Sequence, residues 1–179
     1  DKTNLAIGLG DRKIQLDLYN GALRPAEANL RRQIALCREI EDEFREAIGH
    51  QELGRLLAYR GVWDEAEEEL AASTRYCEQT NDVQGLCIDE AYRALRALLL
   101  ARENVLKTSE VSETSEVYAE AALAAARRAL ELADEDARTV SPVERDYMRA
   151  YWLLGAAYRA SGDLEEADRH LSQALARCR

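Results

Sequence analysis

Apolar side chains recur at helical spacing along most of this chain. Ala47 is followed by Leu53, Leu56 and Leu57, the last three at positions i, i+3 and i+4, and a second stripe of small or apolar residues at Ala66, Leu70 and Ser73 follows Gly61. Spacing of this kind gives an α-helix one apolar face. The pattern therefore predicts two amphipathic helices joined at Gly61, which together form a helical hairpin.

The same turn pattern occurs at three places in the chain. The segments are YNGALRPAEANL from Tyr19, YRGVWDEAEEEL from Tyr59 and ASGDLEEADRHL from Ala160. In each, a glycine is followed five residues later by alanine and nine residues later by leucine. Glycine ends a helix in a left-handed conformation at little cost, and a small alanine lets the second helix approach the first closely. We expect the same hairpin at all three places.

A fourth hairpin is predicted between the second and third glycine turns. Its first helix lies within VQGLCIDEAYRALRALLLARE from Val83, and its second helix is YAEAALAAARRALELA from Tyr118. The extra residues fall mainly in the Ser/Thr/Glu-rich segment that begins at Asn104, where we find no apolar stripe and predict an exposed loop at about 104–116. The predicted hairpins are roughly 1–41, 42–81, 82–136 and 140–179.

Composition favours an all-α protein. Ala, Leu, Glu and Arg dominate, and the chain has only two prolines, Pro25 and Pro142. Because a lone hairpin leaves an apolar face exposed, we expect the four hairpins to stack as a right-handed α-solenoid that forms a single domain over residues 1–179. The chain begins at Asp1 rather than Met, so we expect it to be a fragment of a larger protein.

The charge balance argues against two classes of partner. The chain has 34 acidic and 24 basic side chains and a formal net charge of −10. Such a field repels nucleic acid and anionic lipid headgroups. No apolar run approaches the roughly 20 residues that a membrane span requires. We predict no nucleic-acid partner and no membrane association.

The cysteines follow the repeat rather than a disulfide or metal pattern. Cys37, Cys77 and Cys178 each stand sixteen residues after a turn glycine, so we expect all three at one buried position of the repeat. Cys87 is expected in the core as well. No Cys-x-x-Cys pair points to a metal. Reduced, buried thiols fit a cytoplasmic location.

The chain offers no pattern that indicates catalysis. His50 and His170 belong to no nucleophile or zinc motif, and His50 is expected to pack between helices. Gly8 and Gly10 follow no predicted strand, so they do not make a nucleotide-binding loop. We predict no enzyme activity, no cofactor and no metal.

Two segments resemble tetratricopeptide repeats. They are ELGRLLAYRGVWDEAEEEL from Glu52 and WLLGAAYRASGDLEEADRHLSQAL from Trp152, and each carries a Leu-Gly pair, at Leu53–Gly54 and Leu154–Gly155. The resemblance covers nearly the whole chain. It departs from the family where Lys13 and Ile14 replace the Leu-Gly pair of the first hairpin and in the missing closing proline. The resemblance implies a protein- or peptide-binding array.

A wider resemblance concerns the protein from which such an array comes. The forty-residue period and EANLRRQIALCREIEDEFREAIGHQELGRLLAYRG resemble the C-terminal arrays of bacterial STAND-class signalling ATPases, which carry an NB-ARC-type nucleotide switch. That resemblance implies a sensor that releases the ATPase to oligomerise. Two alternatives stay open: a scaffold on another effector, such as a protease or a transcriptional activator, and a module that self-associates through its ends.

The tetratricopeptide resemblance also implies a ligand surface, because the first helices of such hairpins line a concave groove. The positions that match are Gln15, Tyr19, Gln51, Arg55, Tyr59, Arg149, Trp152 and Arg159. Arginine and aromatic side chains are the types that anchor peptides. The hypothesis is an acidic or C-terminal peptide held by Arg55, Arg149 and Arg159. The alternative is that Tyr59 and Trp152 only pack between hairpins.

Overall fold

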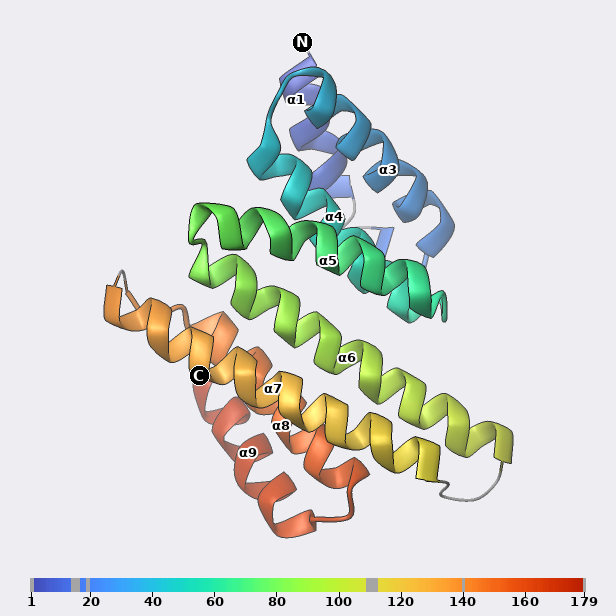
Figure 1. The fold of residues 1–179 in the computed structure, drawn as a ribbon, viewed down its shortest axis with the longest axis vertical. Helices are drawn as coiled ribbons and strands as arrows, with labels where there is room; N and C mark the ends of the chain where they lie inside the picture. The colour runs from blue at the N-terminus through green and yellow to red at the C-terminus, as the bar shows by residue number, and fades with distance from the viewer. Residues whose placement is uncertain (1, 14–16, 19, 109–112, 140, 179) are drawn as a thin grey trace. The chain divides into compact units, whose positions relative to one another are not determined.

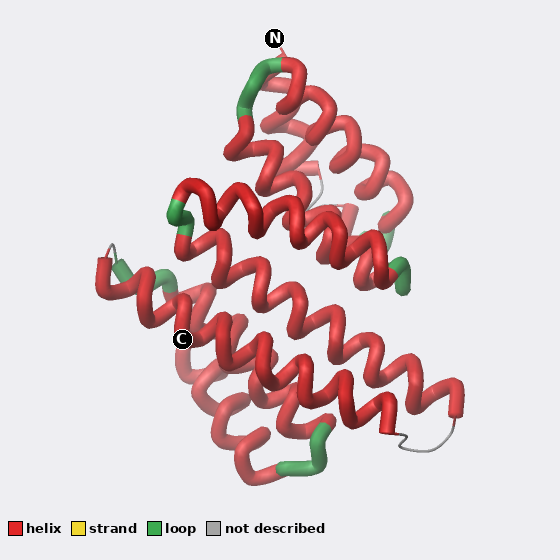
Figure 2. The backbone as a smooth tube through the Cα atoms, in the orientation of Figure 1, coloured by secondary structure: helices red, strands yellow, loops and turns green. Residues whose placement is uncertain are grey.

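The computed structural model describes residues 2–13, 17–18, 20–108, 113–139 and 141–178. Its helices are α1 (Lys2–Ile7), the π-helix η1 (Gly8–Lys13), α3 (Leu23–Glu39), α4 (Glu43–Tyr59), α5 (Trp63–Thr80), α6 (Val83–Thr108), α7 (Glu113–Thr139), α8 (Glu144–Ala160) and α9 (Leu164–Arg177) (Figure 1). Within the described ranges there is no strand, and short loops separate the helices (Figure 2). The prediction of an all-α protein is confirmed.

The chain divides into two compact units, Asp1–Thr80 and Asn81–Arg179. In the first unit α1 and η1 pack on α3, α3 packs on α4, and α4 packs on α5. In the second unit α6 pairs with α7 and α8 pairs with α9, while α8 also packs on both α6 and α7. Each unit thus consists of neighbouring helices packed in pairs. The expected single domain, in which one superhelix runs through both units, stays a prediction.

Each predicted glycine turn has the expected left-handed backbone. The φ angles are +70° at Gly21, +75° at Gly61 and +88° at Gly162. At Gly61 the carbonyl of Leu57 accepts hydrogen bonds from the amides of Arg60 and Val62, each at 3.0 Å, which closes the end of α4. A β-carbon is unfavourable at such φ values, and this explains why glycine recurs there.

The Leu-Gly pairs lie where two helices come closest. A β-carbon on Gly54 would stand 2.7 Å from Cγ of Leu70 and 3.0 Å from the backbone oxygen of Ala66. Gly155 repeats the arrangement, with its β-carbon position 2.5 Å from Cγ of Leu171. Glycine on the first helix and alanine on the second therefore set the close approach, as the sequence pattern predicted for the alanine.

The third hairpin differs from its prediction. Instead of a loop over 104–116, α6 continues to Thr108 and α7 already begins at Glu113, so the loop prediction is wrong at both ends. Residues 109–112 lie outside the described part of the chain. The predicted loop contains no glycine or proline that would end a helix. The Asn104 side chain also donates to the Leu100 carbonyl at 2.9 Å within the helix.

Small residues dominate the core of the second unit. The buried cluster contains Cys87, Ala91, Ala94 and Leu95 of α6, Ala126, Ala129, Leu132 and Ala133 of α7, and Tyr147, Ala150, Leu153 and Leu154 of α8. Alanines in three consecutive helices let the helix axes approach closely, so α8 can contact α6 and α7 together.

One cysteine departs from the predicted pattern. Cys37, Cys77 and Cys87 are buried, as expected, but Cys178 is exposed. It forms the C-cap of α9, beyond the last residue of the helix, where its sulfur lies 3.1 Å from Sδ of Met148. Sequence position in the repeat therefore did not predict its burial.

We expect only Cys178 to react rapidly with a thiol reagent in the native protein. Burial raises the pKa of Cys87 to about 12 and raises that of Cys37, so neither is a reactive thiolate at pH 8. Timed labelling should show one fast thiol of the four, and Cys178→Ser should remove the fast phase. Fast labelling that persists in Cys178→Ser would contradict the burial of the other three.

None of the described helices is both long and apolar enough to cross a membrane. The described residues also contain no group of three or more His, Cys, Asp or Glu side chains arranged to hold a metal ion.

Candidate functional site

The residues predicted for a concave surface lie on two helices, one in each unit. Gln51, Arg55 and Tyr59 are on α4, whereas Arg149, Trp152 and Arg159 are on α8. Gln15 and Tyr19 fall outside the described residues.

On α4, one of the three predicted residues presents a large surface. Gln51 is buried, and Arg55 forms an ion pair with Glu52 that leaves its side chain 19% exposed. Tyr59, in contrast, is 47% exposed at the end of the helix. Tyr59 is thus the member of this set that a ligand could contact without rearrangement of α4.

On α8, Arg149 is engaged within the protein. Its guanidinium contacts Asp146 at 3.2 Å and lies 5.5 Å from the centroid of the Tyr92 ring in α6. Asp146 is 3% exposed and also accepts a hydrogen bond from Nε2 of Gln84 at 3.0 Å. Arg149 therefore joins α8 to α6. This structural role explains the arginine at position 149 without any contact to a ligand.

The other two residues of α8 lie together at a groove of about 400 Å³. Trp152 and Arg159 are both exposed there, as is Arg102 of α6. The apolar lining comes from Leu95, Leu98, Leu99, Val105 and Leu106 of α6 and from Ala156 and Ala160 of α8. Ser115 and Glu116, near the start of α7, also line the groove. Of the predicted site residues, Trp152 and Arg159 are the pair that the structure brings together at a groove.

The two guanidiniums at this groove have no ion-pair partner among the described residues. Four other arginines of the second unit pair with a carboxylate three residues away, namely Arg93, Arg128, Arg149 and Arg169. Arg102 and Arg159 stand beside an apolar surface instead, with Glu116 as the one carboxylate among the described lining residues. In a chain of net charge −10, two available cations at one groove favour a ligand with negative charge.

No ligand position was predicted on the first helix of the third hairpin, although Arg102 lies within that predicted helix. The signal was nonetheless present. Leu98, Leu99, Arg102, Val105 and Leu106 continue the spacing of three and four that marks one helix face. This stripe places Arg102 on the same helix face as Leu106. To place it near Trp152 and Arg159 also requires the packing of α6 on α8, which the sequence alone does not show.

A second pocket, of about 490 Å³, lies in the first unit between α3, α4 and α5. His50 of α4 is nearly buried beside it and bonds to Glu69 of α5, while Arg38 of α3 contacts both Glu46 at 2.5 Å and Nε2 of His50 at 3.1 Å. The expected interhelix role of His50 accounts for these contacts.

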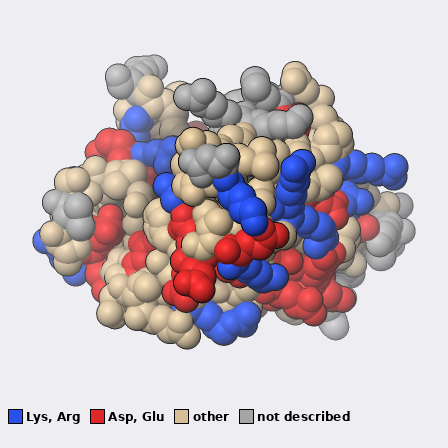
Figure 3. All heavy atoms as spheres, turned by 90° about the horizontal axis from the view of Figure 1, so that it is seen from above, with Lys and Arg blue, Asp and Glu red and all other residues tan. Residues whose placement is uncertain are grey.

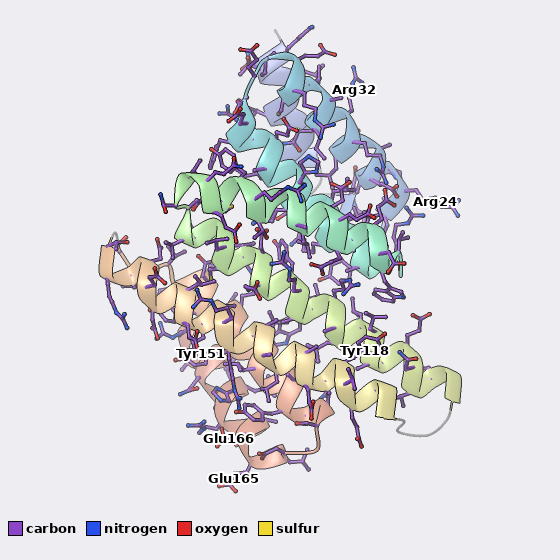
Figure 4. The ribbon with its side chains drawn as sticks, in the orientation of Figure 1. Arg24, Arg32, Tyr118, Tyr151, Glu165 and Glu166 are labelled. Atoms are coloured by element: carbon purple, nitrogen blue, oxygen red, sulfur yellow. The ribbon has the colours of Figure 1, made fainter. Side chains whose placement is uncertain are left out.

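His170 is also part of an interhelix contact. It is 8% exposed and its ring stacks on Tyr151 at 5.9 Å and on Tyr158 at 5.3 Å between ring centroids. Burial, followed by the charge of Arg169, lowers the pKa of His170 and so favours its neutral form. Figure 4 shows Tyr151 together with Glu165 and Glu166, which stand at the start of α9.

Charged side chains of opposite sign are interspersed rather than segregated. On the face seen in Figure 3, Asp and Glu side chains lie next to Lys and Arg side chains. In the first unit such contacts include Arg31 with Glu65 at 2.6 Å. Surface pairs of this kind contribute little to stability, and they leave that face without one extended basic patch.

A scan against family models finds no family that matches this chain, and a search of curated proteins finds no match.

Proposed function

We propose that this chain is a non-catalytic, protein- or peptide-binding array of tetratricopeptide-like hairpins stacked as a right-handed solenoid. The observation that carries the proposal is the exposure of Trp152 and Arg159 side by side at the groove of the second unit. An exposed indole beside an available guanidinium is a typical anchor for a peptide. The repeated glycine turns, and the close approach of the two helices at Gly54 and Ala66, support the proposal that the hairpins are tetratricopeptide-like.

The charge of the groove supports a ligand of acidic character, or the C-terminal carboxylate of a peptide. Arg159 is the guanidinium that would meet such a group, since Arg55 and Arg149 already pair with Glu52 and Asp146. A guanidinium binds a carboxylate through two parallel hydrogen bonds, which gives orientation as well as affinity.

For the larger context, we propose that the array is the sensor or regulatory part of a cytoplasmic, multidomain bacterial signalling ATPase. The forty-residue period and the sequence from Glu27 to Gly61 support this assignment. The coding sequence that adjoins this chain would test it. A phosphate-binding loop there supports the assignment, whereas a protease or a DNA-binding domain favours the scaffold alternative.

A second candidate, self-association, draws on a different surface of the second unit. Leu175 is 59% exposed beside a pocket of about 510 Å³ that Met148, Trp152 and Leu171 also line. Light scattering over a concentration series distinguishes the two candidates. A monomer supports the sensor, and a stable dimer that Leu175→Asp dissociates supports self-association.

Peptides selected on the purified chain from a random displayed library provide the binding test. We expect Arg159→Ala and Trp152→Ala each to weaken the selected peptides by about 1–3 kcal/mol without a change in melting temperature, because both side chains are exposed. The matched control is Arg128→Ala on α7, whose exposed side chain pairs with Glu131 at 3.1 Å. Peptides that bind all three variants as they bind the unaltered chain would contradict this site.

A further inference from the structure

The groove of the second unit follows one face of α6. Its lining residues on that helix include Leu95, Leu98, Leu99, Arg102, Val105 and Leu106, which repeat at intervals of three and four. From Leu95 to Leu106 this stripe extends for roughly 16 Å, given a rise of about 1.5 Å per residue. The stripe reaches so far because α6 has 26 residues, whereas α4 and α8 have 17 each.

The opposite wall is a shorter stripe on α8. Trp152, Ala156, Arg159 and Ala160 are spaced by four, three and one residues, which also places them on one helix face. Since α6 and α8 pack on each other, their two stripes form a trough between neighbouring helices. A trough of this shape accepts the side chains of a third helix, as ridges pack into grooves.

Large apolar side chains remain uncovered along this trough. Leu106 is 72% exposed, Val105 is 38% exposed and Trp152 is 47% exposed. Contiguous exposed apolar surface of this kind marks interaction sites. The occupant must therefore present an apolar stripe of its own.

The polar groups of the trough select the backbone conformation of the occupant. An extended segment would bring its backbone amides and carbonyls against Leu, Val, Ala and Trp side chains, and buried backbone groups require partners. The polar side-chain groups of the described lining are those of Ser115, Glu116 and the two arginines, together with the indole N–H of Trp152, fewer than the backbone of an extended segment requires. A helix satisfies its own backbone hydrogen bonds, so it can lie in the trough without such partners.

Charge determines the other property of the occupant. Arg102 lies in the middle of the α6 stripe and Arg159 lies on α8, and neither has an ion-pair partner within the described part of the chain. A ligand helix with carboxylates flanking its apolar stripe would pair with both guanidiniums. A basic helix would instead place its own cations against the guanidiniums of Arg102 and Arg159.

We propose that this trough binds an acidic amphipathic helix of about three turns from a partner protein. The inference rests on the proposed binding function and names the ligand class of the same site. It corresponds to helix-in-groove recognition, in which apolar side chains at positions i, i+3, i+4 and i+7 enter the groove. The partner helix carries acidic residues on both sides of that stripe.

Two displayed libraries of equal diversity test the proposal with defined probes. One presents a helical scaffold with a fixed leucine stripe and with flanking positions randomised among Glu, Lys and Gln. The other presents extended peptides that contain proline and vary the same residues. We expect binders from the helical library with Glu enriched at the flanks, and a roughly tenfold loss of affinity in Arg102→Gln, Arg159→Gln or Leu106→Asp.

The charge-reversed variant Arg102→Glu/Arg159→Glu tests directly whether these two positions pair with the charged flanks of the ligand helix. We expect it to select Lys in place of Glu at the flanking positions, with Arg128→Glu on α7 as a control that leaves the selection unchanged. A reversal of preference requires direct pairing at these two positions, so altered folding cannot produce it. Flank selection that stays acidic in the reversed variant would overturn the proposal.

The remaining outcomes separate this inference from the proposed function. Binders that come only from the extended library and lose affinity in Trp152→Ala overturn the helical ligand but keep the peptide-binding site. An absence of binders from both libraries overturns both. Concentration-dependent self-association that Leu106→Asp abolishes would assign the trough to a second copy of the chain and would also overturn the proposal.

Discussion

Asp146→Ala is expected to lower the free energy of unfolding of the second unit by about 3 kcal/mol. Asp146 is 3% exposed, contacts Arg149 at 3.2 Å and accepts a hydrogen bond from Gln84. Removing its carboxylate leaves the guanidinium of Arg149 with no counter-charge at that contact. An uncompensated charge in such surroundings costs far more than a surface ion pair gains.

Urea unfolding followed through Trp152 fluorescence measures this effect in the second unit. The chain has two tryptophans, so Trp63→Phe leaves Trp152 as the single reporter. Asp146→Leu/Arg149→Met serves as the paired control, because an apolar pair in place of a buried ion pair recovers most of the stability. If the single substitution changes the unfolding free energy by less than about 1 kcal/mol, the contact does not have the strength that its burial implies.

Leu70→Ala is expected to destabilise the first unit by about 2–5 kcal/mol, the range for truncation of a buried leucine. Leu70 is fully buried and its Cγ faces the position where a β-carbon of Gly54 would stand. Gly54→Ala places a methyl group in that space, and by itself it should destabilise by about 1–3 kcal/mol through overpacking. The double substitution should be less destabilising than the sum of the two.

A double-mutant cycle in the Trp152→Phe background isolates the coupling of these two positions, because Trp63 then reports on the first unit alone. The coupling energy is expected to be about 1 kcal/mol or more in favour of the double substitution. Gly155→Ala/Leu171→Ala repeats the experiment in the second unit. Strictly additive effects would mean that Gly54 and Leu70 do not share one space.

Sequence patterns predicted the features that depend on local chain geometry. The left-handed turns at Gly21, Gly61 and Gly162 and the close approach of Gly54 to Ala66 follow from backbone sterics and helical period. These constraints act within about ten to forty residues. Repetition of the same pattern made them visible without any knowledge of tertiary packing.

The groove was predicted less completely because side-chain availability depends on neighbours. Arg55 and Arg149 were expected to be anchors, yet each pairs with a carboxylate three residues earlier, Glu52 and Asp146. That spacing is visible in the sequence and argues for a local pair. Whether such a pair is buried, as Asp146 is, depends on the packing of α8 against α6.

Two further differences have the same origin. Cys178 occupies the repeat position of two buried cysteines but caps the end of α9, where its side chain is exposed. The segment near Asn104 is rich in Ser, Thr and Glu, yet helix persists to Thr108. Polar composition does not end a helix in the absence of a glycine or proline.

The glycine turns also have an evolutionary consequence. The backbone hydrogen bonds of the turn at Gly61, such as that from Val62 to Leu57, begin and end within its own hairpin. Gly21 and Gly61 stand forty residues apart with the same backbone geometry. A gene duplication or deletion of one forty-residue block with its ends at these turns would keep each turn intact, so a chain of this design can change its length without inventing new local structure.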